Sequence, residues 1–165
     1  KKTWSRQKPY IQSLACDMPS LQEAFLTALN TCGIIRFRDK RLDQSVSEHY
    51  YVAIPVDRNM SLLLCIITSQ VQKRIDYAKR MKSIDGLVKV SKKDIPYLDM
   101  ESIIDCNQTS LVPKTSEKLY WLEINTFKMY GELSSAVRNR VFAAIRKSPV
   151  VAEAIKQMLP SWKLR

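Results

Sequence analysis

Apolar residues occur in short runs along the chain, separated by polar and turn-forming residues. The longest run, residues 62–67, is continuously apolar and predicts a strand over residues 61–68 that is buried on both faces. A partner strand is predicted over residues 49–55, joined to it by a turn at residues 57–59. Weaker alternation predicts further strands over residues 33–38, 87–90, 102–106 and 119–127.

Helical spacing marks two segments in the first half of the chain. Residues 20–32 begin with the capping box Ser20-Leu21-Gln22-Glu23, and Gly33 follows as a typical helix stop. A basic helix is predicted over residues 69–82, with Ser69 as its N-cap and Gly86 after its end. Its inward side is expected to hold Val71, Ile75, Ala78 and Met81.

Two more helices are predicted near the C-terminus. The first follows Gly131 and Ser134, and the second begins with Ser148 as N-cap and Pro149 in its first turn. Pro160 should end the second helix. The first is expected to bury Val137, Val141, Phe142 and Ile145, and the second Val151, Ala154, Ile155 and Met158.

The length of 165 residues and the 45% hydrophobic content indicate a folded protein of one domain with an added arm. We divide it into an N-terminal arm and helix, residues 1–45, and a main domain, residues 46–165. No apolar run approaches the roughly 18 residues of a membrane span, so we expect a cytoplasmic protein with no membrane partner. The four cysteines form no C-x-x-C pair, which favours reduced structural thiols.

The formal net charge of +11 points to a polyanionic partner, with nucleic acid first and an acidic protein second. The charge is uneven. Residues 70–93 hold eight basic and two acidic residues, residues 134–165 hold seven and one, and residues 94–133 hold three and seven. Solvated helix faces are the alternative explanation for each basic segment.

Composition also excludes several classes of enzyme. His49 is the only histidine, so a multi-histidine metal site is impossible, and three glycines leave little material for a phosphate-binding glycine loop. Neither G-x-x-x-x-G-K-[ST] nor H-E-x-x-H occurs. We therefore expect neither a cofactor nor a bound metal.

Three motifs follow one another in the order found in a known family. They are the apolar strand ending in Thr68-Ser69, the segment Ser102-Ile103-Ile104-Asp105-Cys106-Asn107-Gln108, and the turn Gly131-Glu132-Leu133-Ser134 before an amphipathic helix. On these motifs, residues 33–159 resemble the MazF/PemK-like toxins of toxin–antitoxin systems. The segment 20–32 and the basic helix after Thr68-Ser69 are additions to that family's core.

The resemblance implies an α+β fold built on an SH3-like small antiparallel β-barrel of the MazF/PemK/CcdB-like type. It also implies a homodimer, metal-independent endoribonuclease activity on single-stranded RNA, and neutralisation by an antitoxin protein. Family members usually carry a catalytic Arg-Pro where this chain has Glu48-His49. The alternative function is therefore a non-catalytic RNA-binding or protein-interaction module on the same fold.

The candidate catalytic residues are His49, Thr68 and Arg58. His49 has the one side chain with an ordinary pKa near neutrality, and its alternative role is surface or packing. Thr68 matches a family site position, and Arg58 could stabilise phosphorane charge. The candidate RNA-binding residues are Ser69, Lys73, Arg74, Arg80, Ser102, Gln108 and Tyr50.

Several of these candidates also have a structural explanation. Ser69 could simply cap the helix that follows it. Tyr50, like Tyr51 and Tyr97, could stack on unpaired bases or pack within the sheet.

Overall fold

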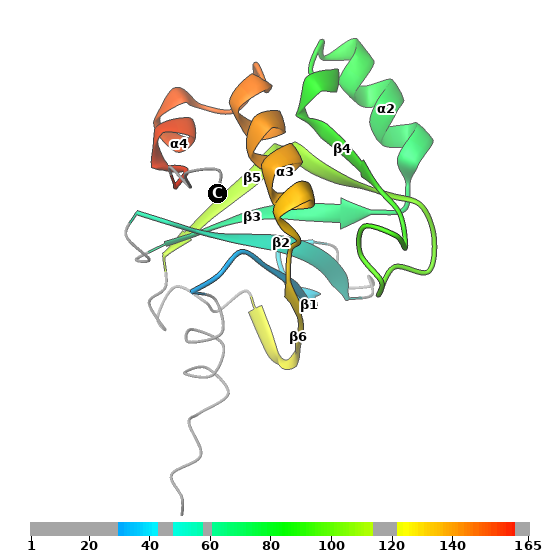
Figure 1. The fold of residues 1–165 in the computed structure, drawn as a ribbon, viewed down its shortest axis with the longest axis vertical. Helices are drawn as coiled ribbons and strands as arrows, with labels where there is room; N and C mark the ends of the chain where they lie inside the picture. The colour runs from blue at the N-terminus through cyan, green and yellow to red at the C-terminus, as the bar shows by residue number, and fades with distance from the viewer. Residues whose placement is uncertain (1–29, 43–47, 58–60, 114–121, 161–165) are drawn as a thin grey trace, which may run out of the picture.

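The computed structural model describes residues 30–42, 48–57, 61–113 and 122–160, with residues 122–125 described by their backbone alone (Figure 1). Within these ranges the fold is α+β, with one six-stranded antiparallel sheet and three α-helices. The strands are β1 (Gly33–Asp39), β2 (His49–Val56), β3 (Ser61–Thr68), β4 (Leu87–Val90), β5 (Ser102–Pro113) and β6 (Leu122–Glu132). The helices are α2 (Val71–Arg80), α3 (Ser135–Lys147) and α4 (Glu153–Met158), with a 3-10 turn, η1, at Ile84–Gly86.

The sheet has the strand order β4-β5-β3-β2-β1-β6. Among the described strands β4 and β6 do not pair with each other, so the sheet is not closed as a barrel. Strand β5 is bent, because Cys65 of β3 pairs with Thr109 whereas the next residue, Ile66, pairs with Asp105. Residues 106–108 therefore bulge out of the ladder, a device that lets one strand change direction.

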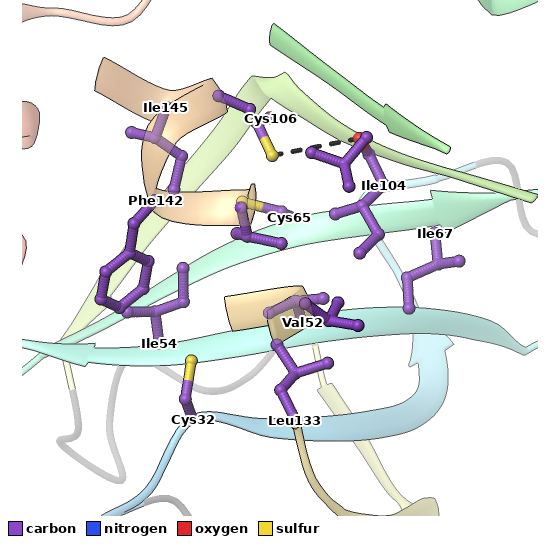
Figure 2. Packing of buried hydrophobic residues seen from close by; sticks show 14 of the residues in the cluster. Cys32, Val52, Ile54, Cys65, Ile67, Ile104, Cys106, Leu133, Phe142 and Ile145 are labelled. Atoms are coloured by element: carbon purple, nitrogen blue, oxygen red, sulfur yellow. Dashed lines mark hydrogen bonds between the residues drawn. The ribbon is translucent and has the colours of Figure 1, made fainter. Parts of the chain in front are cut away.

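The two central strands, β3 and β2, are buried on both faces, as the apolar run of β3 predicted for that strand. Alternate residues of β2 and β3 fill a larger cluster under α3, which Figure 2 shows around Val52, Cys65 and Phe142. The remaining positions form a second cluster on the opposite face of the sheet. It contains Ile35, Phe37, Tyr51, Ala53, Leu62, Leu64 and Val112.

Helix α3 confirms its prediction. Ser134 is its N-cap, with Oγ accepting the Val137 N–H at 3.3 Å. The predicted inward residues of α3 are all buried. Figure 1 shows this helix lying across one face of the sheet, where it closes the larger cluster.

The prediction for the last helix is wrong at its start. Ser148 ends α3 instead of opening α4, because its N–H bonds to the Ala144 carbonyl at 2.9 Å. Helix α4 begins four residues later, with Ala152 at its N-cap, and buries none of its own residues. The flanking residues Val151 and Leu159 are buried in the core, and Ile155 of α4 packs against it partly buried, whereas Ala154 and Met158 are exposed.

The basic helix is shorter and less buried than predicted. Gln70 is the N-cap of α2 and makes no side-chain cap bond, so Ser69 does not have the capping role expected of it. Ala78 is the one buried residue of α2, and Met81 is exposed.

Gly131 lies inside β6, not in a turn before α3.

Some predictions fall outside the described residues. They include the N-terminal arm, the helix over 20–32, Cys16 and the candidate Arg58. Cys32, Cys65 and Cys106 are buried and free, as predicted for reduced thiols. None of the helices in the described ranges is both long and apolar enough to cross a membrane.

Candidate functional site

A cleft of about 350 Å³ opens where β2 begins and β3 ends. Five of the predicted site residues line it, although they come from three different strands and the residue after β3. They are His49, Tyr50, Thr68, Ser69 and Ser102. The remaining walls are formed by Glu48, Ile67, Gln70, Leu98, Asp99 and Met100.

The strand register explains why these residues meet. Strands β2 and β3 are antiparallel with Tyr50 opposite Ile67, so the start of one lies beside the end of the other. Continuing that register by one residue brings His49 level with Thr68 on the same face of the sheet. Tyr50 points to the other face, because successive strand residues alternate. The cleft therefore wraps around the end of this strand pair.

His49 combines partial burial with a polar atom that has no partner. Its Nε2 is buried and makes no hydrogen bond within the described part of the chain. Burial lowers the pKa of His49 below 6.5, and the charge of Asp39 opposes that shift only in part. The imidazole is therefore neutral at pH 7, which is the state that a general base requires.

Thr68, the last residue of β3, lines the cleft. Its Oγ1 accepts the Gln70 N–H at 3.2 Å, which fixes the oxygen and leaves its proton to be donated. The carbonyl of Ser69 accepts the Val71 N–H at 2.8 Å, and Ser69 is exposed. Both hydroxyls thus lie at the rim of the sheet, as their place at the strand end predicted.

Ser102 has a supporting role. It is buried, and its Oγ donates to the Met100 carbonyl at 3.1 Å. This bond shapes the end of the segment 91–101, which forms one wall of the cleft. Ser102 therefore helps to hold that wall and also lines the cleft, and its predicted contact with RNA stays a prediction.

The same wall is fixed at its other end. Asp94 accepts the Ser91 N–H at 2.9 Å and pairs with Arg140 of α3 at 2.8 Å. The hydrogen bond from the Ser91 N–H lowers the pKa of Asp94 below its usual value, and the charge of Arg140 adds a smaller effect in the same direction. Ile95 and Leu98 are buried in the main cluster. The segment 91–101 is thus tied to α3 and to the core.

A basic group beside the cleft was missed from the sequence. Arg36 of β1 lies opposite Tyr50 in the register, with its guanidinium 5.2 Å from the centre of that ring. Its Nε is 3.0 Å from Glu48, whose carboxylate also lines the cleft. An arginine inside an apolar strand is the one sequence signal that could have marked it.

The other predicted binding residues lie outside the cleft. Arg74 pairs with Asp105 at 3.4 Å, and the Arg80 guanidinium lies 6.0 Å from the Tyr77 ring centre on α2 itself. Lys73 is exposed on the same helix. Gln108 lines a separate hollow of about 270 Å³ with residues of the second cluster, because the β5 bulge carries it away.

No cluster of three or more potential metal-ligating His, Cys, Asp or Glu side chains occurs within the described ranges. Comparison of the sequence with protein-family models and with curated proteins gives no match.

Proposed function

We propose that the cleft binds single-stranded RNA and that the protein is a metal-independent endoribonuclease similar to the MazF/PemK-like toxins. The observation that supports this most is the convergence of His49, Tyr50, Thr68 and Ser69 on one cleft. The net charge of +11 favours association with a polyanion.

The chemistry requires three events at one phosphodiester. Neutral His49 accepts the proton of the 2′-hydroxyl, and the 2′-oxygen then attacks phosphorus. Thr68 donates a hydrogen bond to a non-bridging oxygen as negative charge develops there. The bond from phosphorus to the 5′-oxygen breaks, and that oxygen takes a proton from water. The products carry a 2′,3′-cyclic phosphate and a 5′-hydroxyl.

The resemblance extends the proposal to the whole assembly. In this extended proposal, the strands belong to an SH3-like barrel and two copies of the protein form a homodimer. An acidic segment of the antitoxin covers the basic surface, and the complex is cytoplasmic. Arg58 remains a proposed catalytic cation, and Lys73, Arg74 and Arg80 remain proposed phosphate contacts along α2.

The test is incubation of the protein with a mixed-sequence single-stranded RNA in EDTA, followed by analysis of the product ends. We expect cyclic-phosphate ends, and a loss of roughly 100-fold or more in rate for His49→Gln, the usual contribution of a general base. Thr68→Val removes the hydroxyl at constant shape and should also slow cleavage. Ser61→Ala, at the opposite end of β3, is the matched control and should cleave normally.

The alternative is a binding module without catalysis. The observation that favours it is the start of β2, where Glu48 and His49 stand in place of the Arg-Pro typical of the family. This alternative predicts salt-dependent RNA binding with intact RNA after prolonged incubation. Full activity of His49→Gln would instead remove His49 from the mechanism.

A further inference from the structure

Three tyrosines form a connected row of rings beside the cleft. The centre of the Tyr130 ring is 5.2 Å from that of Tyr50 and 5.1 Å from that of Tyr97, each pair tilted by 57°. Arg36 lies over the Tyr50 ring. The four side chains come from β1, β2, β6 and the segment 91–101, so the fold alone brings them together.

Polar interactions link the members of the row. Interaction with Arg36, the larger effect, and with Tyr50 lowers the pKa of Tyr130. The ion pair with Glu48 holds Arg36 from the other side. The rings therefore have defined positions before any ligand arrives.

The row is open to solvent at one end. Tyr97 is 48% exposed, and Tyr50 and Tyr130 are only partly buried against the main cluster. Tyr51 differs from these three tyrosines. It is buried, its ring centre lies 4.7 Å from that of Phe37, and its hydroxyl donates to Asp39. Tyr51 is thus a packing residue, whereas the row presents aromatic surface outward.

Gly131 follows Tyr130 in β6 and lies next to Tyr97. It has φ +115°, a left-handed value that favours glycine, and the Tyr97 hydroxyl lies 3.9 Å from the position of an added Cβ. The segment after Tyr97 is anchored by buried Leu98. Backbone and core together thus place Tyr97 against β6.

We propose that Tyr50, Tyr130, Tyr97 and Arg36 form a subsite that stacks unpaired nucleobases of a single strand passing through the cleft. The inference rests on the proposed RNA-binding function and adds where the bases lie. Tyr50 belongs to both the cleft wall and the row, and Tyr97 directly precedes the wall residues Leu98, Asp99 and Met100. A single strand that passes around the end of the β2–β3 pair would meet the row, where Arg36 lies over the Tyr50 ring. Aromatic platforms with adjacent cations are the usual means of binding single strands without base pairing.

The test uses a 2′-O-methyl RNA of about eight nucleotides, within the usual site size for single-strand binding. This RNA lacks the 2′-hydroxyl and so cannot be cleaved. One version carries 2-aminopurine, whose fluorescence reports base stacking, and a second carries abasic sites. We expect the wild type to quench the fluorophore and to bind the abasic version at least about tenfold more weakly.

Variants of Tyr97 separate stacking from charge. Tyr97→Ala should lose the quenching and bind the base-containing RNA about tenfold more weakly, and Tyr97→Phe should retain both. Tyr77→Ala is the matched control, because Tyr77 is 43% exposed and also has an arginine over its ring, but lies on α2. It should behave as the wild type.

The outcomes distinguish this inference from the function on which it rests. If the wild type binds neither RNA, both are overturned. If the wild type binds, but Tyr97→Ala binds and quenches equally, only the stacking subsite is overturned. A loss confined to Tyr77→Ala would also overturn it and would place the bases on α2.

Discussion

Replacing Gly86 with alanine should break a buried polar contact far from the cleft. An added Cβ at Gly86 would lie 2.0 Å from Asn107 Oδ1 and 2.5 Å from its Cγ. Asn107 cannot simply turn away, since its Nδ2 donates to the Ser83 carbonyl at 2.9 Å and its Oδ1 accepts from Ser148 Oγ at 2.7 Å. The substitution therefore displaces the amide and breaks both bonds.

The cost follows from the loss of two buried hydrogen bonds. Ser83 and Ser148 are 2% and 0% exposed, so water cannot replace the lost bonds. The Ser83 carbonyl keeps the Gly86 N–H at 3.1 Å, whereas the Ser148 hydroxyl loses its acceptor. A lost hydrogen bond costs about 0.5–1.5 kcal/mol, and a buried group left unsatisfied costs about 1–3 kcal/mol. The backbone at Gly86 is not left-handed, so alanine adds no strain there and gains about 0.4–1 kcal/mol through the unfolded chain. We expect a net loss of about 1–4 kcal/mol.

The assay is urea unfolding followed by circular dichroism, applied to Gly86→Ala, Asn107→Ala and the double variant. Asn107→Ala loses the same two bonds but also removes the atoms that clash. The double variant should therefore be about as stable as Asn107→Ala alone, instead of showing the sum of both losses. Gly86→Ala within about 0.5 kcal/mol of the wild type, or strictly additive losses, would refute the reasoning.

Three further predictions concern local features. Ser134→Ala removes the N-cap of α3 and should cost about 1 kcal/mol in the same unfolding assay, whereas Ser134→Asp should retain most of that stability. The pKa of His49 is lowered on folding, so stability should fall as pH drops through its unfolded value near 6.5. A His49→Gln variant with the same pH dependence from 8 to 5 would contradict this. Burial raises the pKa of Cys32 to about 12. The interaction with the Cys65 thiol, followed by burial, raises the pKa of Cys106 well above its ordinary value. With buried Cys65, they should resist iodoacetamide at pH 8 until the protein is unfolded, as peptide mapping would show.

Local sequence signals predicted the elements that local physics determines. The apolar run of β3 and the Ser134 cap of α3 needed no distant partner. The start of α4 failed because Ser148 and Pro149 have the pattern of a helix N-terminus. In the folded chain the hydroxyl of Ser148 donates to Asn107, 41 residues away, and its N–H completes α3. A long-range contact overrode a local preference.

The candidate site also has residues whose proximity the sequence could predict and residues whose proximity it could not. Residues at the adjoining ends of two consecutive antiparallel strands, such as His49 and Thr68, could be placed together from the hairpin alone. Arg36 and Tyr130 could not, because their positions depend on the pairing of β1 with β6, which contains two register shifts. Gln108 was misplaced because nothing in the sequence marks residues 106–108 as a bulge.

The pairing of β1 with β6 also determines when the sheet can be completed during synthesis. Strand β1 acquires β2 at once, but its other edge stays open until residues 122–132 leave the ribosome. At roughly 5–20 residues per second, that wait is on the order of ten seconds. Throughout it, the nascent chain exposes an apolar strand edge to other chains. Slower translation of the second half would therefore reduce the yield of folded protein even if the stability of the finished fold were unchanged.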